Sequence, residues 1–238
     1  MQTPLQRVGH KGADLLAPGN TRASFDAALA AGVDMIEFDV LPELGPQRRA
    51  ARPRLLLAHD YGEPAELTLE QGLDHLASPA FAQLRFDVDL KLPGYELEVV
   101  GALRHRGLTQ RVLISTTHRS SLRLLRRDAP DVRVGWSVPN LRRDPFTSPL
   151  LIPGAFAAMH AARAILPGRA AAALRAGHCH ALMANWRLVT PRLAREVRAA
   201  GGELYVWTVD ELSEIRRLRD IGVTGVISND PRLFAALV

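Results

Sequence analysis

The sequence predicts an α/β protein that folds as a closed, TIM-type (β/α)8 barrel. Three observations point to this class: the chain has 238 residues, short aliphatic runs alternate with longer amphipathic stretches, and about eight such pairs can be counted. Alternation at this spacing is typical of parallel βαβ units, and eight units fit one barrel domain. A doubly wound open sheet is the alternative. Because no linker interrupts the chain, we expect a single domain over residues 1–238.

Nine segments have the aliphatic or β-branched character of strands, one more than a barrel needs. Only residues 41–53 separate the second from the third, and this segment contains three prolines and a glycine. A parallel crossover takes about a dozen residues or more and usually a helix, so the third segment is predicted to return as a β-hairpin. The segments are Leu5–Gly9, Met35–Val40, Arg54–His59, Arg85–Lys91, Val112–Thr116, Val134–Val138, Ala181–Ala184, Leu204–Val209 and Gly225–Ser228.

Ala-, Leu- and Arg-rich segments with helical periodicity lie between most of these strands. They are Thr21–Ala31, Leu69–Ala77, Glu96–Arg106, Ser120–Asp128, Pro191–Ala200 and Asp210–Ile221. The longest irregular stretch is Pro139–Pro153, which follows a predicted barrel strand. We interpret it as a surface excursion, and a wall or lid over a substrate is the alternative.

Composition excludes several classes of protein. Lys and Arg exceed Asp and Glu by 30 to 25, but the arginines are spread over helices and aromatic residues make up only 5%, so nucleic-acid binding is not expected. A single cysteine, Cys179, allows no intrachain disulfide. No apolar run approaches the roughly 20 residues of a membrane span, and the N-terminus lacks the pattern of a signal peptide. We therefore expect a cytoplasmic protein; its oligomeric state does not follow from the sequence.

Ionisable residues are concentrated at the ends of four predicted strands. Residues i and i+2 of a strand face the same side, so Glu37 and Asp39 face one side while the aliphatic residues around them face the other. The helix layer of a barrel requires the aliphatic side, which places the carboxylates inside the barrel near its C-terminal end. The four groups are His10-Lys11, Glu37-Phe38-Asp39, His59-Asp60 and Asp87-Val88-Asp89-Leu90-Lys91.

Converging carboxylates repel one another and resist ionisation in a barrel interior, and a divalent cation removes that conflict. Oxygen ligands suit Mg²⁺ or Ca²⁺. Nearby histidines offer acid and base groups, and lysines offer charge for phosphate oxygens. With no Ser or Cys nucleophile motif, this set favours phosphoryl over acyl chemistry. Each motif alone also has an ordinary structural explanation, such as a hydrogen-bonded polar histidine or an internal ion pair between Asp89 and Lys91. Because all four motifs lie at successive strand ends, we favour a catalytic role for them.

The order of these motifs resembles the glycerophosphodiester phosphodiesterase family. That family opens with His-Arg-Gly and Pro-Glu-Asn-Thr, continues with Ile-Glu-x-Asp-Val, His-Asp and Glu-x-Lys, and later has Val-Trp-Thr-Val-Asn and Gly-Ile-x-Thr-Asp-x-Pro. The corresponding residues here are His10-Lys11-Gly12, Pro18-Gly19-Asn20-Thr21, Ile36–Val40, His59-Asp60, Asp89-Leu90-Lys91, Val206–Val209 and Gly225–Pro231. The resemblance covers nearly the whole chain and implies the same barrel.

The resemblance implies one bound Mg²⁺ or Ca²⁺, ligated by Glu37, Asp39 and Asp89. It implies His10 and His59 as the acid–base pair, with His10 as acid and His59 as base, although the two roles are interchangeable at this point. It further implies that four residues contact the substrate: Lys11, Asn20, Lys91 and Trp207. Of these, Trp207 lines the alcohol side of the pocket. The expected reaction releases an alcohol and glycerol 3-phosphate from a small-molecule phosphodiester.

Three substitutions and one deletion depart from the family pattern. Lys11 replaces Arg, Gly19 replaces Glu, and Asp89 replaces a Glu that is one methylene longer. The subdomain that usually follows His-Asp is reduced to Tyr61–Leu67, so we expect a more open pocket. An Asp-x-Lys strand also resembles the sphingomyelinase-D-like relatives. The alternatives are therefore a lysophospholipase D or sphingomyelinase D-like phosphodiesterase, and a non-catalytic relative that binds a phosphate-bearing ligand.

Overall fold

The computed structural model describes residues 4–43, 54–62, 65–139 and 152–237. Within these ranges the strands are β1 (Gln6–Gly9), β2 (Met35–Pro42), β3 (Leu55–Leu57), β4 (Arg85–Leu90), β5 (Val112–Thr116), β6 (Arg133–Val138), β7 (Ala181–Asn185), β8 (Glu203–Trp207) and β9 (Gly225–Ser228). Each coincides with a predicted segment to within a few residues. Most of the prediction for Pro139–Pro153, that of a surface excursion or a lid, lies outside the described residues.

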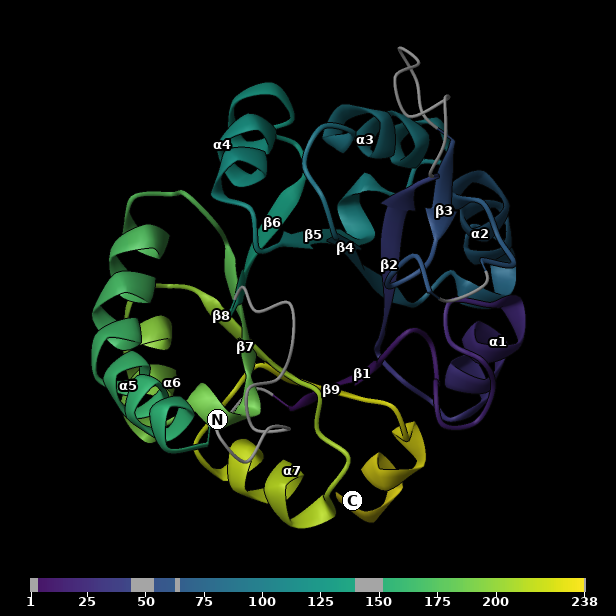
Figure 1. The fold of residues 1–238 in the computed structure, drawn as a ribbon. Coiled ribbons are helices and arrows are strands. Elements are labelled where there is room, and N and C mark those ends of the chain that lie inside the picture. The colour runs from purple at the N-terminus through teal and green to yellow at the C-terminus, as the bar shows by residue number, and fades with distance from the viewer. Residues whose placement is uncertain (1–3, 44–53, 63–64, 140–151, 238) are drawn as a thin grey trace.

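Eight of the strands form a closed parallel barrel, which confirms the predicted fold (Figure 1). Parallel pairs run in the order β1-β9-β8-β7-β6-β5-β4-β2, and a pairing of β1 with β2 closes the ring. The ninth strand, β3, lies antiparallel against the end of β2, with Val40 opposite Leu57. Strand β3 thus returns alongside β2, as the short, proline-containing sequence between the two strands predicts.

Helices surround the barrel on its outer side (Figure 1). They are α1 (Arg22–Ala30), α2 (Leu69–Leu76), α3 (Glu96–His105), α4 (Arg119–Asp128), α5 (Ile152–Arg175), α6 (Pro191–Ala199) and α7 (Leu212–Asp220). Thr21 caps α1 and Thr68 caps α2, each with a reciprocal capping box. Such caps satisfy backbone donors that a helix N-terminus otherwise leaves unpaired. None of the described helices has the length and apolar character needed to cross a membrane.

Helix α5 is absent from the six predicted helices. It spans 24 residues and contains Pro167. Its glycines and proline are helix-breaking signals, and its alanines form no narrow apolar stripe. Packing of Leu166, Ala170 and Leu174 into the core stabilises it, so tertiary contacts override the local signal.

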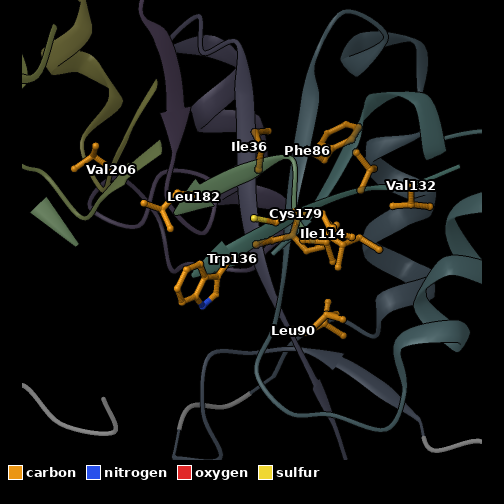
Figure 2. Close-up of a cluster of buried hydrophobic side chains, with 14 of the residues drawn as sticks. Ile36, Phe86, Leu90, Ile114, Val132, Trp136, Cys179, Leu182 and Val206 are labelled. Atoms are coloured by element: carbon orange, nitrogen blue, oxygen red, sulfur yellow. The ribbon is translucent and has the colours of Figure 1, made fainter. Parts of the chain in front are cut away.

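The core has two parts, and the period-2 pattern of the strands assigns residues to each. Outward-facing residues pack against the helices; Figure 2 shows Ile36, Phe86, Leu90 and Ile114 in this layer. Inward-facing residues form a smaller cluster inside the barrel. That cluster comprises Val8, Met35, Leu113, Ala181, Met183, Tyr205 and Ile227. Glu37 and Asp39 alternate with Ile36 and Phe38, so the outward packing of the apolar pair directs the carboxylates inward.

Candidate active site

The acidic side chains of β2 and β4 meet at the C-terminal end of the barrel. The register places Glu37 beside Asp87 and Asp39 beside Asp89. One carboxylate oxygen from each of Glu37, Asp39 and Asp89 lies within 4.8 Å of the other two. Two oxygens bound to one Mg²⁺ or Ca²⁺ are at most about 4–5 Å apart, given ligand distances of about 2.0–2.6 Å. The three predicted ligands are therefore close enough to share an ion, even though Asp89 is shorter than Glu.

Lys91 supplies positive charge to the same carboxylates. Its Nζ lies 2.6 Å from Asp39 Oδ1 and 2.5 Å from Asp89 Oδ2. Apart from that ion pair, Asp39 Oδ1 accepts no hydrogen bond from the described residues, and Asp39 is fully buried. The candidate ligands are all carboxylate oxygens, and one of them, Asp39 Oδ1, is buried with no hydrogen bond from the described part of the chain beyond its ion pair with Lys91. Such a set of oxygen donors suits a divalent cation. Contact of Lys91 with a phosphate oxygen stays a prediction.

Crowding perturbs the carboxyl groups in opposite directions. Burial, followed by repulsion from Asp39, raises the pKa of Glu37 well above its ordinary value. Burial also acts to raise the pKa of Asp39, but the Lys91 ammonium and the two histidines hold it well below its usual range. Burial and the neighbouring Asp89 raise the pKa of Asp87, and no described donor reaches its Oδ1. Perturbed groups of this kind concentrate at functional sites.

His10 follows β1 and lies beside the carboxylates. Its Nε2 is 3.8 Å from Glu37 Oε2, and its Nδ1 is 2.6 Å from Asn229 Oδ1. Its side chain is 19% exposed, so one edge remains accessible to a ligand. Burial lowers the pKa of His10, although Asp39 and the hydrogen bond to the Asn229 amide oxygen oppose this shift.

His59 lies at the outer edge of the same site, after β3. Its side chain is 46% exposed, and its Nδ1 is 3.5 Å from Asp60 Oδ2. It is near enough to Asp39 to help lower the pKa of that carboxyl group. The two predicted histidines thus approach the carboxylates from different depths, with His10 the more enclosed.

Asn20 and Lys11 shape the loop between β1 and α1. Both have left-handed backbone conformations, with φ of 60° at Asn20 and 48° at Lys11. The Asn20 Nδ2 donates to Asp39 Oδ2, and its Oδ1 accepts from the Asp39 backbone N–H, both at 3.0 Å. The Lys11 N–H donates to Glu37 Oε2 at 2.8 Å. This loop therefore orients both β2 carboxylates, whereas substrate contact by Asn20 stays a prediction.

Two departures from the family pattern are neighbours in space. A Cβ added at Gly19 would lie 2.8 Å from the Lys11 side chain and 2.5 Å from Asp14 Oδ1. The Lys11 Nζ is 3.6 Å from Asp14 Oδ2. The Lys11 chain therefore packs over Gly19 and leaves little room for a larger residue at this position. A lysine at 11 and a glycine at 19 thus fit as a pair.

Trp207 ends β8 inside the barrel mouth. It is half-buried and packs against the interior cluster, and the register places it beside Asn185 of β7. Its position on a strand across the ring from β2 suits a pocket wall, and its contact with the alcohol part of a substrate stays a prediction (Figure 1).

Two residues near His10 did not emerge as site residues from the sequence. Asn229 contacts the imidazole, and Asp210 binds Asn229 through two hydrogen bonds. Their positions in the sequence could have indicated a role in the site. Asp210 follows the Val-Trp-Thr-Val segment, and Asn229 lies in the closing Gly225–Pro231 motif. Strand ends carry barrel function, so both were open to prediction.

Oxygen ligands beside two imidazoles and an ammonium group suit phosphoryl chemistry, and they lie where barrel enzymes carry their sites. Fold and site together define a barrel phosphodiesterase. The chain belongs to the glycerophosphoryl diester phosphodiesterase family, whose model matches residues 10–41 and 87–233. His59 and the β3 hairpin lie between the two matched segments.

Individual relatives agree with this family. A glycerophosphodiester phosphodiesterase of Caldanaerobacter subterraneus subsp. tengcongensis is 23% identical over 97% of this chain and 96% of its own length. The structure of a glycerophosphodiester phosphodiesterase from Agrobacterium tumefaciens has a TM-score of 0.68 at 20% identity, covering 98% of this chain and 99% of that one. A phosphodiesterase from Oleispira antarctica, solved with the product sn-glycerol-3-phosphate, has a TM-score of 0.66 at 18% identity, covering 98% and 96%. These likenesses to solved structures establish the shared barrel.

Proposed function

We propose that this phosphodiesterase hydrolyses glycerophosphodiesters to glycerol 3-phosphate and an alcohol with the aid of one Mg²⁺ or Ca²⁺. The observation that carries the proposal is the meeting of Glu37, Asp39 and Asp89 within 4.8 Å, beside His10. Family membership and the glycerol 3-phosphate complex of the Oleispira antarctica relative support the substrate class.

Glu37, Asp39 and Asp89 would hold the cation. A bound divalent cation supplies Lewis acidity and orients a phosphate oxygen. Lys91, bridging two of the ligands, and Lys11 would neutralise the remaining charge of the phosphate. Trp207 would contact the alcohol part. These contacts together hold the phosphorus between the two histidines.

His10 and His59 would transfer the protons. One imidazole takes a proton from the attacking hydroxyl or water, and the other gives a proton to the departing alkoxide, so no unstable alkoxide is released. The 46% exposure of the His59 side chain supports a proton-transfer role at the solvent side of the site. Its position outside the matched family segments makes it the residue whose role most needs testing.

The product pair tests the proposed function. Incubation with glycerophosphocholine should yield choline and glycerol 3-phosphate, detected by a coupled glycerol-3-phosphate dehydrogenase assay. Phosphocholine and glycerol would indicate cleavage of the other ester bond. Turnover of lysophosphatidylcholine or sphingomyelin alone would favour the lysophospholipase D or sphingomyelinase D-like alternative. Calorimetric binding of glycerol 3-phosphate with no turnover of any diester would identify a non-catalytic relative and refute the proposal.

We further propose that residues 1–238 act as one barrel domain on a small soluble diester. Each of the ligand-bearing strands belongs to the same closed ring, so no second domain is needed to complete the site. The expected cytoplasmic location and the absence of a nucleic-acid partner stay predictions.

A further inference from the structure

The imidazole of His10 is held from the side opposite to the carboxylates. Asn229 follows β9, and its Oδ1 lies 2.6 Å from His10 Nδ1. The other ring nitrogen, Nε2, lies 3.8 Å from Glu37 Oε2 and faces the candidate metal ligands. The two nitrogens therefore have separate environments, one in the protein scaffold and one in the site.

Asp210 fixes the orientation of the Asn229 side chain. The Asn229 backbone N–H donates to Asp210 Oδ1 at 2.8 Å, and Nδ2 donates to Asp210 Oδ2 at 2.7 Å. A flipped amide would bring its oxygen against the carboxylate, which offers no proton to share. The amide nitrogen must therefore face Asp210, and the amide oxygen must face His10.

An amide oxygen only accepts hydrogen bonds, so His10 Nδ1 must carry the proton. In a neutral imidazole the other nitrogen then has the free lone pair. We propose that Asp210, acting through Asn229, holds His10 as the Nδ1–H tautomer and makes Nε2 the nitrogen that exchanges protons at the active site. Asp210 and Asn229 are positioning residues in this arrangement, and its catalytic meaning rests on the proposed function.

The two positions differ from the family pattern in a matched way. In the family pattern the late strand motif ends in Asn and the closing motif contains Asp. Here the corresponding residues are Asp210 and Asn229, so the carboxylate and the amide have exchanged places. In this chain the acid and the amide are in contact, and the neutral amide is the partner next to His10.

A purely structural role for Asp210 is the competing explanation. Asp210 Oδ1 also accepts from Ser228 Oγ at 2.9 Å, which ties the loop after β8 to the end of β9. Loss of that tie would lower thermal stability without altering the protonation of His10. The tautomer of His10 is therefore the readout that separates the two explanations.

Nitrogen-15 NMR of the full chain with labelled histidines tests the proposal directly, at a pH where the imidazole is neutral and without substrate. A His10→Gln variant assigns the resonance. The wild type should show a protonated Nδ1 and an unprotonated Nε2, and Asp210→Asn should give a mixture of tautomers because its Asn229 amide is free to flip. A protonated Nε2 in the wild type, or an unchanged spectrum in Asp210→Asn, would overturn the proposal. This readout does not depend on any diester being a substrate.

Kinetics supply a second readout with a matched rescue. Asp210→Asn should lower kcat by about tenfold or more, the scale of losing a partner that orients a functional histidine, while KM changes little. Asn229→Asp should also lower kcat, because the new carboxylate would face the carboxylate of Asp210. The double exchange Asp210→Asn/Asn229→Asp restores one acid and one amide and should recover most of the rate. A double variant that folds with an Nδ1–H tautomer yet is no faster than either single variant would contradict the assigned role.

Discussion

At the scale of single residues, the two histidines differ in environment. His10 is enclosed and hydrogen-bonded to Asn229, whereas His59 is half-exposed and lies beside Asp60. Both were predicted from strand-end position. The sequence could not predict the difference between them, because it depends on the loops after β8 and β9, far along the chain from both.

Removal of either histidine should abolish most activity. We expect His10→Ala and His59→Ala each to lower kcat by about 10²-fold or more, the usual effect of losing an acid or base. His105→Ala, at an exposed position of α3, serves as the matched control and should leave turnover unchanged. Steady-state assay of glycerol 3-phosphate release measures all three. A wild-type rate in His59→Ala would remove His59 from the mechanism.

The close packing at Gly19 gives a second prediction at this scale. Gly19→Ala places a Cβ against the Lys11 side chain, so Lys11 must move away from its present position. We expect a several-fold rise in KM with a smaller change in kcat. Gly101→Ala on α3 is the control, because its Cβ would meet no atom within 4 Å. An unchanged KM in a folded Gly19→Ala protein would show that the position of Lys11 does not matter for substrate.

At the scale of elements, the strands were predictable and one helix was not. The alternation of Glu37 and Asp39 with Ile36 and Phe38 fixes both the strand and the direction of its side chains. The hairpin of β3 follows from the prolines after β2. Helix α5 was missed because its stability comes from packing of alanines and Leu166 that no narrow stripe reveals.

The N-terminus of α1 couples helix stability to the site. Thr21 caps α1 and is adjacent to Asn20, which orients Asp39. Thr21→Ala should cost about 1 kcal/mol of stability and also lower activity. Thr68→Ala removes an equivalent cap from α2 and should cost a similar free energy with normal activity. Urea unfolding and turnover measure the two effects, and equal activity of the two variants would show that the α1 cap does not support the site.

At the scale of the whole molecule, the barrel brings together residues separated by more than two hundred positions in the chain. His10 meets Asn229 because the two residues follow β1 and β9, which pair with each other in the closed ring. Sequence motifs predicted the fold and the strands that carry the candidate metal ligands. They could not supply the distances between carboxylates, which depend on the stagger of neighbouring strands, nor the contact of Lys91 with both Asp39 and Asp89.

The raised pKa of Glu37 predicts how the stability of the metal-free protein depends on pH. In the folded state the Glu37 carboxyl group retains a proton that the unfolded chain releases near the ordinary pKa of 4.5. The contribution of Glu37 to the free energy of unfolding therefore falls as the pH rises above that value. Stability of the wild type should therefore decline more with rising pH than that of Glu37→Gln, as measured by urea unfolding. Parallel pH profiles would show that Glu37 is already ionised without a metal.

Metal-dependent turnover tests the central claim most directly, namely that Glu37, Asp39 and Asp89 share one catalytic cation. Protein treated with EDTA and dialysed should release no glycerol 3-phosphate from glycerophosphocholine, and Mg²⁺ or Ca²⁺ should restore release. Asp89→Asn should need a higher concentration of the ion for half-maximal activity, because it removes one ligand charge. Full turnover in EDTA, or identical metal dependence in Asp89→Asn, would contradict the shared site.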